Sequence, residues 1–247
     1  MDRLGATRPA RPDLQGLRTL QLAHLRAVPF ESLSIHLGEE ISLESDALFD
    51  KVVGRRRGGF CYELNGLFAE VLTALGYRVT LLAARVFSGA VPGPLFDHLA
   101  LRVDLDEPWL VDVGFGDFSD GPLRLDGRAE QRDGGGVFQV GLAPGGHGDL
   151  DITHNGDPAY RLTARPYELA DFVPTCWWQA TSPRSHFTRS PVCSMRTARG
   201  RITLRDRKLI DTVDGERTER VLDESELLPA YLDHFGIALD RIPSAGA

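Results

Sequence analysis

One cysteine, Cys61, lies between a pair of glycines and the start of a strongly periodic segment. The apolar residues that follow it recur at the spacing of one buried helix face; they are Leu64, Leu67, Phe68, Val71, Leu72 and Leu75. We therefore expect Cys61 at the N-terminus of a helix that ends near Gly76, where free backbone N–H groups favour an anion. A thiol in this position is expected to ionise more easily and to act as a nucleophile.

A thiol nucleophile needs a base, and His98 has the most suggestive position among the seven histidines. It begins a predicted strand, 98–104, directly after a loop, and such strand ends often carry functional side chains. The next predicted strand, 109–113, carries Asp112 among apolar neighbours, where a carboxylate is costly to bury without a partner. Two strands this close in sequence most simply form an antiparallel hairpin. Cys61, His98 and Asp112 therefore fit the roles of nucleophile, base and orienting acid.

Each of these three residues also has an ordinary structural explanation. Cysteine is commonly a small buried hydrophobic residue, and a histidine at a strand end is commonly satisfied by a neighbour in the core. A single aspartate in a strand is commonly a hydrogen-bonded structural carboxylate. The residues taken one by one leave both interpretations open, and only their joint placement favours catalysis.

The hydrophobic periodicity changes along the chain, and this predicts an α+β protein. The first third is expected to be helical, with helices at 13–28, 43–53 and 61–75 and a connecting loop at 29–34. The middle third is expected to form a small antiparallel sheet or barrel, with strands at 77–87, 98–104, 109–113, 137–142 and 160–164. The last third is expected to be mixed, with a helical turn at 166–172, strands at 192–195, 201–204 and 208–211, and a helix at 225–235.

The composition is that of an ordinary globular protein: of 247 residues, 42% are hydrophobic and 26% are charged. The net charge of -7 disfavours binding to nucleic acid or to an anionic membrane surface. The sequence shows no secretory signal pattern and no apolar run long enough to cross a membrane. The three cysteines lack CxxC spacing, so we expect neither a disulfide framework nor a metal site, and a reducing cytoplasm is the expected setting.

The nucleophile segment, Arg57-Gly58-Gly59-Phe60-Cys61-Tyr62-Glu63-Leu64-Asn65, resembles the nucleophile motif of the arylamine N-acetyltransferases. Further segments resemble the same family in the same order; they are Pro29–Leu33, Asp97–Leu99, Val111–Gly116, Ser182–Phe187 and Pro191–Ser194. The chain departs from the family in having Ser32 where asparagine is frequent, and it is somewhat shorter than many members.

The resemblance implies a fold of three parts, namely an N-terminal helical bundle, a central antiparallel β-barrel and a C-terminal α/β lid. We expect the bundle with the nucleophile at 1–82, the barrel with the histidine and the aspartate at 83–180, and the lid at 181–247. This agrees with the order of helical, extended and mixed segments in the sequence.

The resemblance also implies an activity: transfer of an acetyl group from acetyl-CoA, through an acetyl-cysteine, to arylamines, hydrazines or arylhydroxylamines. Cys61 would be acetylated, His98 would be the base and Asp112 would orient it. The residues that would line the aromatic substrate pocket are Phe30, Val86, Phe115 and Phe187, and Gly116 would contact CoA. Acetyl-CoA would be a cosubstrate with no permanently bound cofactor, and the protein would be a monomer or a weak homo-oligomer.

Three other functions use the same residues. An amide synthase of this family, which closes macrolactams, would have the same catalytic residues with a longer acyl donor. A cysteine hydrolase or a transglutaminase-like enzyme would share the Cys-His-Asp logic. A noncatalytic small-molecule binding protein on the same scaffold belongs to a different class, and the intact set of Cys61, His98 and Asp112 argues against it.

Overall fold

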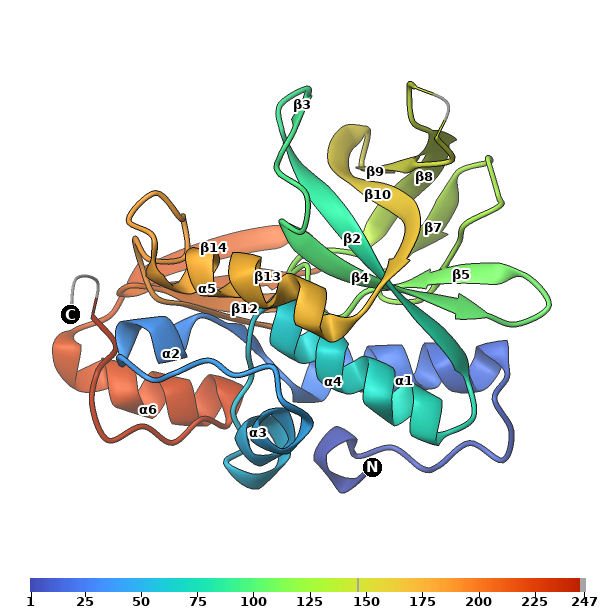
Figure 1. Ribbon diagram of the computed structural model, residues 1–247. Coiled ribbons are helices and arrows are strands. Elements are labelled where there is room, and N and C mark those ends of the chain that lie inside the picture. Colours follow the sequence, from blue (N-terminus) through green and yellow to red (C-terminus); the bar gives the residue numbers. More distant parts are fainter. Residues whose placement is uncertain (146, 245–247) are drawn as a thin grey trace.

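The computed structural model describes residues 1–145 and 147–244, and its helices gather on one side of the barrel (Figure 1). The helices are η1 (Asp2–Leu4), α1 (Leu14–Ala27), α2 (Leu33–His36), α3 (Ser45–Phe49), η2 (Asp50–Gly54), α4 (Cys61–Ala74), η3 (Leu169–Phe172), α5 (Val173–Thr181) and α6 (Glu224–Phe235). The strands of the barrel sheet are β2 (Arg78–Ser88), β3 (Val91–Pro92), β4 (His98–Asp104), β5 (Pro108–Val111), β6 (Leu123–Arg124), β7 (Gln131–Asp133), β8 (Gly136–Leu142), β9 (Leu150–His154) and β10 (Asp157–Tyr167). The second sheet contains β1 (Phe30–Glu31), β11 (Val192–Arg196), β12 (Gly200–Arg205), β13 (Lys208–Val213) and β14 (Glu216–Val221).

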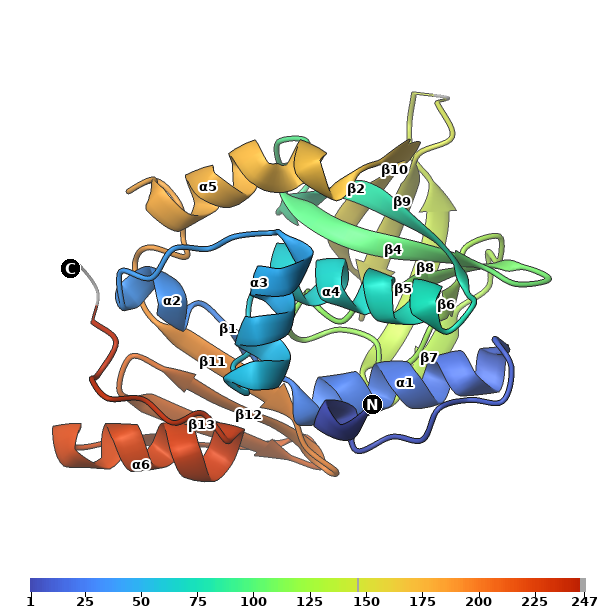
Figure 2. The ribbon, with the colours of Figure 1, turned by 60° about the horizontal axis from the view of Figure 1, so that its bottom comes forward.

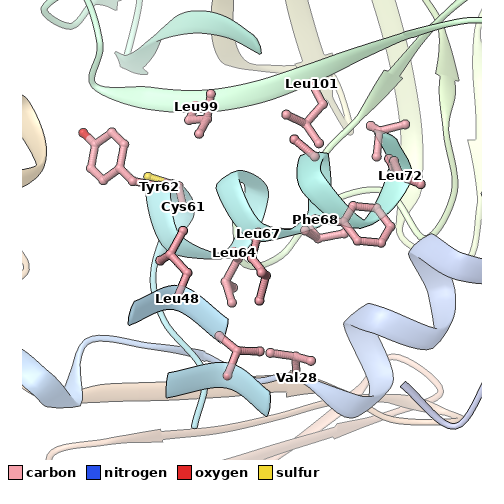
Figure 3. Close-up of a cluster of buried hydrophobic side chains, with 14 of the residues drawn as sticks. Val28, Leu48, Cys61, Tyr62, Leu64, Leu67, Phe68, Leu72, Leu99 and Leu101 are labelled. Carbon is pink, nitrogen blue, oxygen red and sulfur yellow. The ribbon is translucent and has the colours of Figure 1, made fainter. Parts of the chain in front are cut away.

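Helix α4 is central to the fold and lies between the barrel and the other N-terminal helices (Figure 2). Leu64, Leu67, Phe68 and Leu72 are buried, as the spacing predicts, and they belong to one core cluster with residues of α1, α3 and β4, whereas Val71 and Leu75 are partly buried. Figure 3 shows Leu99 and Leu101 of β4 on one side of the helix and Leu48 of α3 on the other. Because its first residue is Cys61, the helix holds that cysteine where these layers meet.

The barrel is a strongly curled antiparallel sheet in the order β6-β5-β4-β2-β10-β9-β8-β7, with β3 paired to β2 outside this path. The Gln131 side chain joins the two end strands, because it accepts a hydrogen bond from the backbone N–H of Arg124 at 2.6 Å and donates to its carbonyl at 3.0 Å. Alternation along β4 sends Leu99 and Leu101 to the α4 core and Ala100 to the barrel interior.

The C-terminal sheet has one apolar and one polar face. On one face, buried residues of β11 and β12 form a core cluster with α6 and α2; they include Cys193, Ile202, Leu204, Leu227, Tyr231 and Leu33. The register places the side chains of Val192, Ser194, Arg201, Thr203 and Arg205 on the opposite face. This second face lines the cavity described below.

The structure confirms the predicted α+β class, with N-terminal helices, an antiparallel barrel, and a C-terminal sheet with its helix. The loop predicted at 29–34 is wrong: Phe30–Glu31 pairs with β11 as β1, and α2 follows directly. The helical turn predicted at 166–172 begins too early, because β10 continues to Tyr167 and the helical residues run from Leu169 through α5.

The division at 1–82, 83–180 and 181–247 stays a prediction, and two elements cross it. Strand β2 spans the boundary between residues 82 and 83. Strand β1 belongs by sequence to the first part and by pairing to the C-terminal sheet. The helical part and the C-terminal part are therefore connected through a shared sheet.

Candidate active site

Two glycines allow other backbone segments to approach the start of α4 closely. A side chain on Gly58 would place its Cβ 1.9 Å from the carbonyl oxygen of Pro29. A side chain on Gly114 would place its Cβ 2.7 Å from the Cα of Cys61. Both distances are far below van der Waals contact, so only glycine fits at these positions. The close approach at Gly114 sets the loop after β5 against the first turn of the helix.

His98 and Asp112 come together at the ends of adjacent strands, as the sequence predicts. His98 is the first residue of β4, and Asp112 directly follows the last residue of β5. The Nε2 atom of His98 lies 2.7 Å from Oδ2 of Asp112, and both side chains are almost fully buried. A carboxylate in this position holds the imidazole in a fixed orientation.

Asp112 has four hydrogen-bonding partners, of which the sequence predicts only His98. Its Oδ1 accepts hydrogen bonds from Asn65 Nδ2 and from the backbone N–H of Gly114, both at 2.9 Å. Its Oδ2 faces His98 and also accepts a hydrogen bond from the Tyr160 hydroxyl at 3.1 Å. A sequence signal for Asn65 exists, because it is a polar residue one helical turn after Cys61 on a buried face. Tyr160 carries no such signal, since a tyrosine is common in a strand.

Asn65 connects the helix to both strands. Its Nδ2 atom also donates to the Leu99 carbonyl at 2.7 Å, and its Oδ1 accepts from the Val113 backbone N–H at 3.0 Å. With the bond to Asp112, all of the hydrogen-bonding groups on this fully buried amide therefore have a partner. The result is a rigid connection between α4 and the two strands that carry His98 and Asp112.

Burial and pairing act in opposite directions on the two titrating groups. Burial raises the pKa of the Cys61 thiol, while hydrogen bonding and the charge of His98 oppose this rise. Burial alone would lower the pKa of His98, but the charge and hydrogen bond of Asp112, together with Cys61, raise it to about 10. The lowered cysteine pKa expected from the sequence is therefore wrong in direction, because Cys61 is only 3% exposed. The imidazole keeps its proton at neutral pH.

The raised pKa of His98 predicts that the protein loses stability as the pH rises. The folded protein keeps the proton of His98 up to about pH 10, whereas the unfolded chain releases it near the ordinary value of 6.5. The stabilisation is therefore complete below pH 6.5 and is lost on the way to pH 10. We expect urea unfolding to show a loss of roughly 2–4 kcal/mol over this range. The loss should be much smaller in His98→Gln, and equal slopes in the two proteins would contradict the assignment.

A cavity of about 830 Å³ opens beside Cys61 and His98. The predicted site residues Phe30, Val86, Phe115, Gly116 and Phe187 all line it as well. Asp112 does not line it and lies behind His98. Two of the lining rings pack against further rings: Phe187 lies 5.3 Å from Phe60, and Phe115 lies 5.1 Å from His98, between ring centroids. The structure thus brings the predicted residues to one site.

The opposite wall of the cavity comes from the polar face of the C-terminal sheet, which the sequence argument missed. The residues of this wall are Ser194, Arg201, Thr203, Arg205, Ile210, Thr212 and Arg217. Arg201 connects it to the loop after β5, because its Nε donates to Asp117 at 3.1 Å and its Nη1 donates to Ser194 Oγ at 3.1 Å. The sequence contains the alternation of these strands but does not show which loop they face.

The segments on either side of the cysteine are held by buried ion pairs. Arg57 contacts Glu31 at 2.9 Å, with side chains only 5% and 0% exposed. Lys51 contacts Glu63 at 2.6 Å, and the other Glu63 oxygen accepts a hydrogen bond from the backbone N–H of Phe60 at 3.2 Å. These contacts fix the chain immediately before Cys61.

Comparison with known proteins identifies the family. A family model described as N-acetyltransferase matches residues 13–243. An arylamine N-acetyltransferase of Mycolicibacterium smegmatis is 35% identical over 97% of this chain and 90% of its own length. The chain belongs to the arylamine N-acetyltransferase family. A Salmonella typhimurium relative, named arylamine N-acetyltransferase / N-hydroxyarylamine O-acetyltransferase, is 34% identical over 94% of this chain and 85% of its length.

Solved structures of arylamine N-acetyltransferases have the same fold. The Salmonella typhimurium enzyme matches with a TM-score of 0.89 and 31% identity, covering 100% of this chain and 92% of its own. The Mycobacterium marinum enzyme, solved in complex with CoA, matches with a TM-score of 0.86 and 32% identity, covering 96% of this chain and 90% of its own. Within residues 1–145 and 147–244, no helix of this arylamine N-acetyltransferase is long and apolar enough to span a membrane. In the same part of the chain, no cluster of three or more His, Cys, Asp or Glu side chains could hold a metal ion.

Proposed function

We propose that Cys61 is the nucleophile through which this acetyl-CoA-dependent arylamine N-acetyltransferase passes an acetyl group to an amine. The observation that supports this most directly is that Cys61 and His98 line one cavity, with Asp112 behind His98 at a contact of 2.7 Å. A relative bound to CoA supports acetyl-CoA as the donor. The names of the relatives support an aromatic amine as the acceptor.

In the first half of the reaction, the thiolate of Cys61 attacks the acetyl carbonyl carbon of acetyl-CoA. The raised pKa of His98 keeps an imidazolium beside the sulfur, and its positive charge favours the thiolate. The negative oxygen of the tetrahedral intermediate is stabilised by backbone N–H groups at the start of α4. The carbon–sulfur bond to CoA then breaks, and His98 gives its proton to the departing CoA thiolate.

In the second half, the amine nitrogen attacks the carbonyl carbon of acetyl-Cys61. Neutral His98 takes the proton of the amine, and Cys61 leaves as a thiolate beside the imidazolium, ready for the next cycle. Acetylation removes the contributions of Cys61 that raise the pKa of His98, so this pKa is lower in the second half than in the free enzyme. Phe30, Val86, Phe115 and Phe187 line the cavity, and in this proposal they receive the acceptor amine. Exclusion of water by these residues protects the acetyl-cysteine from hydrolysis.

We extend the proposal to the setting of the enzyme. The three cysteines are free, which fits a reducing cytoplasm. Acetyl-CoA acts as a cosubstrate rather than as a bound cofactor, Gly116 lies in the cavity wall where CoA would pass, and the protein works as a monomer or a weak homo-oligomer. Hydrazines and arylhydroxylamines are acceptors of the same nucleophilic type as arylamines.

The test follows CoA, acetate and N-acetylated amine together in reactions of acetyl-CoA with and without 4-methylaniline. We expect CoA release to match amine acetylation, with little acetate formed. In Cys61→Ser the rates of CoA release and of amine acetylation should both fall by about 10³-fold or more. Substitution of Cys193, a buried cysteine of the C-terminal core, with serine is the matched control and should leave turnover per folded molecule near the wild-type value. Undiminished amine acetylation by Cys61→Ser would overturn the proposal, and release of acetate without an amine would favour a hydrolase.

A further inference from the structure

The wall of the cavity formed by the C-terminal sheet carries more positive than negative charge. The register of β12, β13 and β14 places the cations Arg201, Arg205, Lys208 and Arg217 on the cavity face, with Glu219 as the acidic residue of these strands on that face. The barrel side of the cavity supplies two carboxylates, Asp97 and Asp117. The whole chain has a net charge of -7, so this face has the opposite sign to the molecule.

Most of these cations already have partners. Arg201 contacts Asp117 at 3.1 Å, Lys208 contacts Glu219 at 3.0 Å, and Arg217 contacts the same glutamate at 2.5 Å. Arg205 differs from them, because within residues 1–145 and 147–244 its side chain has no ion pair and no hydrogen bond. It is exposed, it lines the cavity, and its Cα pairs with that of Val192, which also lines the cavity.

Two further basic residues, His186 and Arg189, belong to the segment that precedes β11. His186 lines the cavity, and the backbone N–H of Arg189 donates to its carbonyl. Burial and the charges of Arg205 and Arg189 lower the pKa of His186. In the described part of the chain the Arg189 side chain has no carboxylate partner either. Asp206, next to Arg205, has its backbone in a turn between β12 and β13.

We propose that Arg205 forms a subsite for phosphate groups in the wall of the cavity. Unpaired guanidinium groups are suited to phosphate, because their N–H groups form charge-assisted, bidentate hydrogen bonds with its oxygens. The subsite binds the phosphate groups of CoA while the thioester reaches Cys61, and in this it rests on the proposed function. The carboxylate of an anionic acceptor amine could bind to the same guanidinium. The test therefore distinguishes the phosphate groups of CoA from such a carboxylate.

The kinetic test compares acetyl-CoA with S-acetylpantetheine, which has the same thioester and no phosphate, at a saturating concentration of 4-methylaniline. Arg205→Gln should raise KM for acetyl-CoA about tenfold, with kcat nearly unchanged, because one charge-assisted contact is lost. KM for S-acetylpantetheine should not change. The matched control is Arg220→Gln, on β14 but on the other face, where Arg220 contacts Glu226 at 2.6 Å; it should behave as the wild type with both donors.

Three results would overturn the subsite. One is an unchanged KM for acetyl-CoA in Arg205→Gln. Another is an equal rise in KM for acetyl-CoA and for S-acetylpantetheine, which would indicate a structural role. The third is a rise in KM for 4-aminobenzoate alone, which would assign Arg205 to an anionic acceptor. A binding measurement keeps this test separate from the proposed function, because calorimetry with adenosine 3′,5′-bisphosphate needs no turnover. We expect about tenfold weaker binding in Arg205→Gln; equal binding in both proteins would contradict the subsite even in an active enzyme.

Discussion

Asp112→Asn should lower acetyl transfer by about 10³–10⁴-fold while the protein stays folded. The carboxylate accepts hydrogen bonds from Asn65, Gly114 and Tyr160 and lies 2.7 Å from Nε2 of His98. An asparagine side chain has one acceptor oxygen in place of two, and its NH2 group would face a donor. Either His98 or Asn65 of α4 would therefore lose its hydrogen-bond acceptor. The charge that raises the pKa of His98 would be lost as well, and burial would then keep the ring neutral.

The measurement is kcat/KM against pH, with near- and far-ultraviolet circular dichroism to confirm folding. Asp104→Asn is a matched control, because Asp104 ends the same strand as His98 and contacts Arg102 at a partly exposed position; we expect wild-type activity. Tyr160→Phe removes one of the four partners of Asp112 and should cost much less than Asp112→Asn. Activity of folded Asp112→Asn within tenfold of the wild type would contradict the role given to this carboxylate.

Arg57→Met should lower the free energy of unfolding by about 3–5 kcal/mol. Arg57 contacts Glu31 at 2.9 Å and Glu39 at 3.2 Å, and it donates to Ser34 Oγ at 3.3 Å. Removing the guanidinium leaves the buried carboxylate of Glu31 without the cation to which it is hydrogen-bonded, and this is more costly than the pair itself is worth. Part of the stability should return in the double variant Arg57→Met/Glu31→Leu, which removes both buried charges.

Arg55→Met provides the comparison in the urea unfolding experiment. Arg55 contacts Asp50 at the same distance of 2.9 Å, but the two side chains are 50% and 64% exposed. We expect its loss to cost about 0–1 kcal/mol, because water and salt screen exposed pairs. Similar losses for Arg55→Met and Arg57→Met would show that burial does not determine the effect.

The sequence was sufficient to predict those parts of the site that lie on elements with a clear local pattern of apolar residues. The period of the apolar residues after Cys61 predicts α4, and the two short strands predict the hairpin that carries His98 and Asp112. These elements depend on near neighbours in the sequence, so their patterns are visible without the fold. The direction of the pKa of Cys61 could not be predicted in this way, because it depends on burial by distant segments.

The elements that the sequence argument missed lack a local signal. Strand β1 has two residues and exists through its pairing with β11, which lies far along the chain. Every residue of β14 is exposed, so the strand has no alternation of apolar and polar residues. Helix α5 exposes Trp177 and Trp178, so its apolar residues do not fall on one buried face and their spacing does not indicate a helix. The cationic wall of the cavity is visible only once the register of β12, β13 and β14 is known.

The acetyl group on Cys61 is the central claim, and mass spectrometry of the protein mixed with acetyl-CoA in the absence of amine tests it most directly. We predict the added mass of one acetyl group, located by peptide mapping on the peptide that contains Cys61, and its transfer to 4-methylaniline when the amine is added. Cys61→Ser should show no such addition. Steady acetylation of the amine without any acetyl group on Cys61, or with the group on another residue, would contradict the account.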